Sequence, residues 1–234
     1  MLAHPVLVGT FHKTGTSLMR KVFREVAKKH ALRFWRRSKD REPDAWDICF
    51  DDHSSFLEAG LLGKRSRCVI SIRDPRDIVI SAARYHVWAR EPWLDVPRRI
   101  YNGRSYREAI ASLPTERERF IFEMDNSSGG TIKRMLAIDQ ADERILVVRL
   151  DDLIVDRDYV QFGRIFRFLG FSEEVVPSCL AVARRHSLFD KKFKSNDHVQ
   201  HTTPALWRTE FDDDLNAEFA SRFGSAIEQL GYPS

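Results

Sequence analysis

The sequence predicts an α/β fold: a single three-layer domain over residues 1–234, with a mostly parallel central sheet flanked by helices. Short apolar segments alternate with segments of helical periodicity, which is the pattern of strand–helix–strand units. Hydrophobic residues make up 43% of the 234 residues, which is enough to bury a core, and this length suits one domain better than two. Ligands of such sheets bind where the parallel strands end, so functional residues are expected there.

Four short apolar segments are the predicted strands. The first of them runs over residues 5–10 (PVLVGT) and leads directly into a glycine-containing turn. The others are residues 46–50 (WDICF), 67–72 (RCVISI) and 144–149 (RILVVR). The residues that follow each segment are therefore the first candidates for a binding site.

Helical periodicity predicts most of the remaining structure. Over residues 16–29 apolar side chains such as Leu18 and Val22 share one face, with lysines and arginines opposite. Asp74 and Pro75 are typical of a helix start, and Gly170 is typical of a helix end. The other predictions are helices over residues 75–89, 116–137, 159–169 and 215–230, an irregular stretch with a short helix over 91–115, and a functional loop over 187–211.

Charge is distributed unevenly along the chain. The formal net charge is +4, but residues 13–41 hold eleven lysines and arginines against two acidic residues. Such a basic segment indicates an anionic ligand, substrate or surface. The alternative, which we expect for most of these side chains, is a solvated helix face.

The cysteines and the first residues of the sequence bear on the compartment. Cys49, Cys68 and Cys179 are odd in number and irregularly spaced, which argues against a disulfide framework or a zinc site. No apolar stretch approaches the roughly 20 residues of a membrane span, and the first positive charge, Lys13, comes too late for the basic start of a secretory signal. We expect a cytoplasmic protein without a transmembrane segment, for which peripheral membrane contact stays open.

A candidate phosphate-binding loop follows the first strand. Residues 9–17 (GTFHKTGTS) combine a short turn, a glycine that lets the backbone approach a ligand, and a helix start whose free amides attract anions. Lys13 adds a positive charge, but it precedes Gly15, so the loop is not a Walker A sequence. An ordinary strand-to-helix turn is the alternative.

A second motif, IRDPRDIVIS, spans residues 72–81. Arg73 lies where the chain leaves the third predicted strand, and its planar guanidinium suits a phosphate. Ser81, two turns into the following helix, supplies a hydroxyl. The alternative role of Arg73 is a salt bridge with Asp74 or Asp77 at the helix start.

Together these motifs resemble the sulfotransferases that use 3′-phosphoadenosine 5′-phosphosulfate (PAPS). The sequence K-T-G-T-S at 13–17 is similar to their 5′-phosphosulfate loop, and IRDPRDIVIS is similar to their 3′-phosphate motif. Looser likenesses cover residues 149–171 and LWRTEF at 206–211. The resemblance implies PAPS as donor, 3′-phosphoadenosine 5′-phosphate (PAP) as product, no required metal, and nucleotide binding by Lys13, Thr14, Gly15, Thr16, Ser17, Arg73 and Ser81.

The same resemblance implies in-line transfer of a sulfuryl group to an acceptor hydroxyl. Lys13 is expected to stabilise the leaving phosphate. His53 follows the strand WDICF at the position of the base histidine in family members that use one, so it is the predicted general base. His12, beside the phosphate loop, is the second candidate.

The likeness weakens at three positions. Leu18 stands where many members have an aromatic residue against adenine, and Leu150 stands in place of a frequent tyrosine. The basic R-K-G segment of the family is replaced by QHT at 200–202. Similar departures are found in a divergent bacterial branch of the family, and the candidates for the missing positive charge are Lys191, Lys192 and Lys194.

Two functions from other classes stay open. Asp51 and Asp52 follow a strand, as does the magnesium-binding aspartate of P-loop kinases and ATPases, although this assignment does not explain IRDPRDIVIS. RFWRRSK, at 33–39, interleaves basic and aromatic residues and fits a non-catalytic binder of acidic polymers. No nucleic-acid partner is predicted.

The acceptor is the least defined partner. A carbohydrate or glycolipid hydroxyl is preferred over a small alcohol or phenol, and it is expected to enter past residues 84–115 and 187–205. The candidates for the floor of its site, with core packing as their alternative role, are Tyr85, His86, Trp88 and Trp93. The sequence makes no prediction of oligomeric state.

Overall fold

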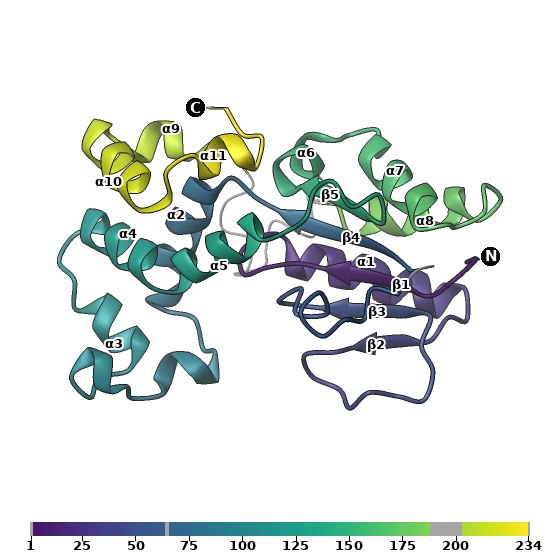
Figure 1. Ribbon diagram of the computed structural model, residues 1–234, viewed down its shortest axis with the longest axis horizontal. Coiled ribbons are helices and arrows are strands. Elements are labelled where there is room, and N and C mark those ends of the chain that lie inside the picture. The colour runs from purple at the N-terminus through teal and green to yellow at the C-terminus, as the bar shows by residue number, and fades with distance from the viewer. Residues whose placement is uncertain (1, 64–65, 188–202, 234) are drawn as a thin grey trace. The chain divides into compact units, whose positions relative to one another are not determined.

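The computed structural model describes residues 2–63, 66–187 and 203–233 (Figure 1). The chain divides into two compact units, Met1–Arg73 with Ile138–Thr202 and Asp74–Ala137 with Thr203–Ser234. The first unit holds the sheet and the second consists of helices. The predicted α/β fold with a parallel sheet flanked by helices is confirmed.

The sheet of the first unit has five strands in the order β2-β3-β1-β4-β5, and every neighbouring pair is parallel. The predicted strands appear as four of them, whereas the three-residue strand β2 was not predicted because it is too short to show a period. Since β1 is central, the carboxyl ends of β3, β1 and β4 are neighbours. The bounds are β1 (Val6–Gly9), β2 (Phe34–Arg36), β3 (Ile48–Asp51), β4 (Arg67–Ile72) and β5 (Ile145–Arg149).

The strands share a core with the helices of the first unit. Side chains of one strand face, such as Val8 and Phe50, belong to the same buried cluster as Met19, Phe23 and Ile165 from the helices. Every residue of β1 and β3 is buried, which explains why these strands are continuous apolar runs without alternation. The helices are α1 (Thr16–Lys29), α6 (Leu150–Val155), α7 (Val160–Phe168) and α8 (Val176–Arg185).

In the second unit, α2 packs against α3, α4, α5 and α9. Two predicted helices are interrupted, the first at Asn126, whose φ of −125° and ψ of −117° leave the helical region, and the second at Gly224, whose φ is 52°. Apolar periodicity continues across both breaks, so the sequence suggested single helices. The elements are α2 (Pro75–His86), η1 (Pro92–Asp95), η2 (Arg99–Tyr101), α3 (Tyr106–Ala111), α4 (Glu116–Asp125), α5 (Ser127–Leu136), α9 (Trp207–Glu210), α10 (Asp213–Phe223) and α11 (Ala226–Gln229).

The three cysteines are free and buried. Burial raises the pKa of Cys49 to about 12 and that of Cys179 to about 11, so these thiols are protonated near neutral pH. Among the described helices, none is both long enough and apolar enough to cross a membrane.

Candidate active site

The loop between β1 and α1 is strongly curved. Lys13 and Gly15 both have positive φ, 66° and 91°. A Cβ on Gly15 would lie 2.8 Å from Cδ1 of Leu150, so this position requires glycine for space as well as for conformation. Gly15 immediately precedes α1, whose first amides have no partner within the helix and are available to an anion.

Hydroxyl groups hold this loop in shape. Thr14 Oγ1 accepts a hydrogen bond from the Phe11 amide at 2.8 Å and donates one to the Phe11 carbonyl at 3.0 Å. Thr16 Oγ1 donates to the same carbonyl at 3.0 Å, and Ser71 Oγ donates to the Thr14 carbonyl at 2.7 Å. The side chains of Thr14 and Thr16 therefore stabilise the loop, while those of Lys13 and Ser17 are half-buried on it.

The loop that follows β3 adjoins the phosphate loop. A Cβ on Gly9 would lie 2.5 Å from Ser54 Oγ, so the glycine at the end of β1 permits this close approach. Ser54 Oγ donates to the Thr10 carbonyl at 2.9 Å, and the Thr10 amide donates to the Asp51 carbonyl at 3.1 Å. The structure thus brings the predicted base loop and the predicted phosphate loop together.

His53 is exposed, and its backbone is held by Asp51. The His53 amide donates to Oδ1 of Asp51 at 2.9 Å. The other carboxylate oxygen accepts from Ser55 Oγ at 2.8 Å and from Arg37 Nη1 at 3.2 Å, and the Asp51 side chain is fully buried. From the sequence alone, the only role proposed for Asp51 is that of a metal ligand. The available signal was its position two residues before His53, which is the spacing of an Asx turn.

The two aspartates are poorly suited to bind magnesium. Asp52 Oδ2 accepts from Arg36 Nε at 3.0 Å, from Arg36 Nη2 at 2.8 Å and from the Ser38 hydroxyl, while Asp51 faces Arg37. An arginine that pairs with a carboxylate competes with a divalent cation for its oxygens and repels it. The two carboxylates with their arginine partners therefore do not fit the metal site of a P-loop kinase.

The same pairs account for the basic segment 33–39. Arg33 forms a two-pronged pair with Asp47, with N–O distances of 2.9 and 2.7 Å. Arg36 and Arg37 are paired with the aspartates at the end of the neighbouring strand β3. Since these three arginines are matched by carboxylates, the segment is a weak candidate for a polymer-binding surface.

Arg73 directly follows β4 and is buried, with 3% of its surface exposed. Because β4 and β3 flank β1, Arg73 and His53 lie at strand ends on either side of the phosphate loop. Three predicted groups of the first unit, Lys13, His53 and Arg73, thus come to one edge of the sheet. His12 is half-buried in the same loop as Lys13.

In the second unit, two motifs that are far apart in the sequence meet. Asp74 caps α2 by accepting from the Arg76 amide at 2.9 Å, and it also pairs with the Arg76 guanidinium. The Trp207 amide, from the LWRTEF motif, donates to Oδ1 of Asp77 at 2.9 Å. The guanidinium carbon of Arg76 lies 3.2 Å from the centre of the Trp207 ring. Arg76 is not among the site residues that the sequence predicts. Ser81 lies two turns into α2 and is half-buried.

The four candidates for the acceptor site differ in exposure. His86 is fully buried and its Nδ1 lies 2.5 Å from Oε1 of Glu123, so its packing role is the better supported. Tyr85 is also buried, and its hydroxyl donates to Glu91 at 2.7 Å. Trp88 is 38% exposed and Trp93 is half-buried, so these two stay candidates.

The candidates for the missing positive charge lie outside the described residues, namely Lys191, Lys192 and Lys194. The same is true of the segment 200–202.

Comparison with known proteins gives structural relatives only. No family model and no curated protein sequence matches the chain. The crystal structure of mouse sulfotransferase SULT7A1 complexed with PAP is similar over 96% of this chain and 84% of that one, with a TM-score of 0.63 and 16% identity. Retinol dehydratase in complex with androsterone and inactive cofactor PAP is similar over 98% and 82% of the two chains, with a TM-score of 0.57 and 11% identity.

The chain has the sulfotransferase fold. A second structure of retinol dehydratase, in a complex with retinol and PAP, agrees over 100% of this chain and 84% of that one, with a TM-score of 0.54 and 11% identity. The fold that the sequence motifs suggested is therefore confirmed over the whole chain by similarity of structure, at sequence identities too low for a sequence comparison to detect.

Proposed function

We propose that this protein is a sulfotransferase that moves the sulfuryl group of PAPS to an acceptor hydroxyl. The observation that carries the proposal is the arrangement of the phosphate loop, His53 and Arg73 at the carboxyl ends of three adjacent strands. The structural relatives with the same fold are complexed with PAP, the product that such a reaction leaves. Active sites of open parallel sheets lie at this edge.

The positive charges and hydrogen-bond donors at this edge of the sheet fit a nucleotide with phosphates at both ends of its ribose. Lys13 and the amides at the start of α1 supply positive charge and hydrogen-bond donors on one strand end, and Arg73 supplies a guanidinium on the next. Gly15 has no Cβ to block the backbone amides. We assign the 5′-phosphosulfate to the loop residues Lys13, Thr14, Gly15, Thr16 and Ser17, and the 3′-phosphate to Arg73 and Ser81.

The reaction needs alignment, a base and charge stabilisation. His53 accepts the proton of the acceptor hydroxyl as the acceptor oxygen bonds to sulfur, and the bond between sulfur and the bridging phosphate oxygen breaks. Lys13 stabilises the negative charge that gathers on the leaving phosphate. The products are the sulfated acceptor and PAP, with the proton on His53. This scheme assigns no step to a metal ion.

For the acceptor we infer a carbohydrate or glycolipid hydroxyl in preference to a small alcohol or phenol. Trp88 and Trp93 support this, since neither residue is buried and an indole face packs well on the apolar side of a sugar ring.

Transfer of labelled sulfate from PAPS to a panel of glycans, glycolipids, phenols and small alcohols tests the proposal. We expect transfer that needs no ATP, and calorimetry should give tighter binding of PAP than of AMP because AMP lacks the group assigned to Arg73. Equal affinity for PAP and AMP would remove that assignment. Turnover that requires ATP and Mg²⁺ and ignores PAPS would replace the sulfotransferase with a kinase or ATPase.

A further inference from the structure

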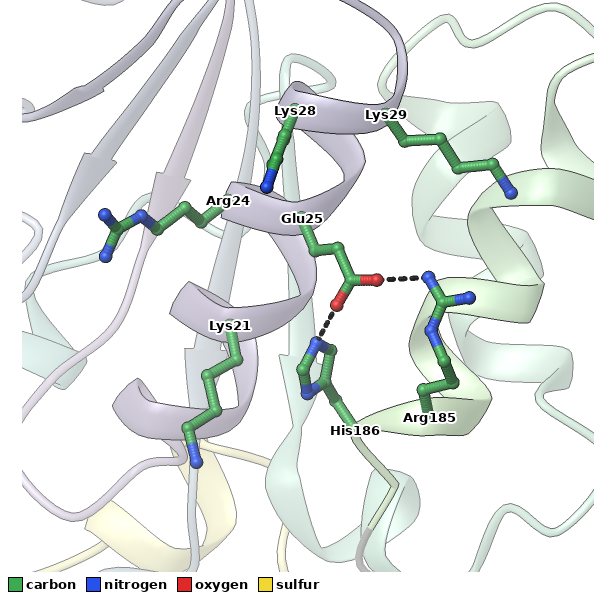
Figure 2. A pocket seen from close by; sticks show the side chains of 7 residues that line it. All are labelled: Lys21, Arg24, Glu25, Lys28, Lys29, Arg185 and His186. Carbon is green, nitrogen blue, oxygen red and sulfur yellow. Dashed lines mark hydrogen bonds and ion pairs between the residues drawn. The ribbon is translucent and has the colours of Figure 1, made fainter.

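A basic groove lies on the exposed face of α1, beside the end of α8 (Figure 2). It has a volume of about 790 Å³. Its seven lining residues all carry ionisable side chains. Six are basic, namely Lys21, Arg24, Lys28, Lys29, Arg185 and His186, and one, Glu25, is acidic. None of these residues has a part in the proposed sulfuryl transfer.

The groove carries a net positive charge. Its lysines and arginines number five against the single Glu25, a formal sum of +4 with His186 neutral. The formal net charge of the whole chain is also +4, so the remaining residues sum to zero. The groove thus carries a local excess of positive charge, which favours an anionic partner.

The acidic residue of the groove is already engaged. Glu25 is paired with Arg185 through one carboxylate oxygen and with His186 through the other, and Figure 2 shows these contacts joining α1 to the end of α8. Within the part of the chain that the structure describes, Arg24 and Lys28 form no ion pair. This differs from Arg33, Arg36 and Arg37, whose charges are matched by aspartates.

The spacing of the cations fits a chain of anionic groups better than a single one. Lys21, Arg24 and Lys28 follow one another at i, i+3 and i+7, so they rise along the helix by about 5 Å at each step. Among the described residues, no aromatic side chain lines the groove, so the bases of a nucleic acid would find no ring there to stack on. The described lining also contains no apolar residue that could anchor the groove to a membrane surface.

We propose that this groove binds an acidic polysaccharide, a chain whose sulfate or carboxylate groups pair with Arg24, Lys28 and their basic neighbours. The site is separate from the phosphate loop, which lies at the beginning of α1 and involves other residues. Binding here requires no nucleotide and no turnover, so it can be tested apart from the proposed function.

The test compares two double variants with the same change of charge. Arg24→Glu/Lys28→Glu alters the groove, and Lys133→Glu/Arg134→Glu alters exposed residues of α5 in the second unit. Each variant lowers the formal net charge from +4 to zero. The probe is a fluorescently labelled heparin octasaccharide, whose binding is followed by anisotropy over a range of salt concentrations without PAPS.

We expect the groove variant to bind the octasaccharide roughly tenfold or more weakly and to reduce the slope of log K against log salt by one to two, because about two fewer counterions are released. The α5 variant should stay within about threefold of the unmodified protein. Arg24→Gln/Lys28→Gln serves as a milder groove variant if charge reversal disturbs folding, which circular dichroism would reveal.

Three results would overturn the proposal. One is the absence of octasaccharide binding by the unmodified protein. Another is equal weakening by the two double variants, which would mean diffuse attraction to the whole surface. The third is tighter binding of a single-stranded oligonucleotide of matched charge, which would assign the groove to nucleic acid. A normal rate of sulfate transfer in the groove variant would show separately that the proposed active site is intact.

Discussion

The loops that follow β1 and β3 adjoin each other at Gly9 but are held by different chemistry. Neutral hydroxyls of Thr14, Thr16 and Ser71 stabilise the first loop through its own carbonyls and amides. A buried carboxylate, Asp51, stabilises the second loop together with Arg37, which directly follows the neighbouring strand β2. The hydroxyl bonds of the first loop involve no charged side chain, whereas the second loop combines hydroxyl bonds of Ser54 and Ser55 with a charge pair.

This difference predicts which residues of each loop affect activity and which affect stability. In the first loop, the side chain that would meet the donor is Lys13, and the side chains that keep the shape are threonines. In the second loop, the proposed base is the exposed His53, and the residue that keeps the shape is the buried Asp51. In both loops, replacing the functional side chain should lower activity and leave the loop conformation intact. Replacing the threonines or Asp51 should disturb both the conformation and the activity.

The largest effect is expected for Lys13→Ala. We expect kcat to fall by roughly 10²–10³-fold, because the charge opposite the leaving phosphate is lost, while the melting temperature stays unchanged. The matched variant is Thr14→Val, which removes a buried hydroxyl that bonds within the loop and should lower the free energy of unfolding by about 1–3 kcal/mol. Sulfate transfer and thermal melting measure both. An unchanged kcat in Lys13→Ala would refute the leaving-group role.

His53→Ala should follow, with a rate lower by about 10²-fold, as expected for loss of a general base. The melting temperature should not change, because the side chain is exposed. His12→Ala is the matched variant, since His12 is the other histidine close to the loop. If His12→Ala costs more rate than His53→Ala, the base has been assigned to the wrong loop.

Asp51→Asn should affect both stability and rate. It keeps an oxygen for the His53 amide but loses the charge opposite Arg37, so we expect a loss of about 1–3 kcal/mol in the free energy of unfolding. As a positioning residue, Asp51 should lower kcat by several-fold and leave the dissociation constant of PAP unchanged, because the phosphate loop has its own bonds. Urea unfolding, single-turnover rates and calorimetry measure these quantities. A full kcat in the folded variant would limit Asp51 to a structural role.

The smallest effect is expected for Arg33→Ala. Its pair with Asp47 lies on the surface, where 59% of the Arg33 side chain is exposed, and such pairs contribute little. Neither the melting temperature nor kcat should change measurably. A decrease in melting temperature as large as that of Asp51→Asn would mean that β2 depends on this pair, and the contrast between buried and exposed charge pairs would fail.

Much of the fold could be predicted because its signals are local. The strands β1, β3, β4 and β5 are short apolar runs, and α1 has an apolar face over fourteen residues. The strand β2 could not be predicted, since three residues show no period and its pairing with β3 is a long-range contact. The breaks at Asn126 and Gly224 were missed because the apolar faces of the helices continue on both sides of them.

The sequence by itself determined after which strands the proposed functional residues come: the phosphate loop after the first strand, His53 after WDICF and Arg73 after RCVISI. Glycine spacing, charge and periodicity are properties of neighbouring residues, so they can be seen along the chain. Only the tertiary structure decided which charges are matched, because ion pairs form between residues that pairing of β2 with β3, or packing of α8 on α1, brings together. For that reason the three arginines of segment 33–39 turned out to be paired with aspartates, and the groove on α1 turned out to be an exposed basic surface.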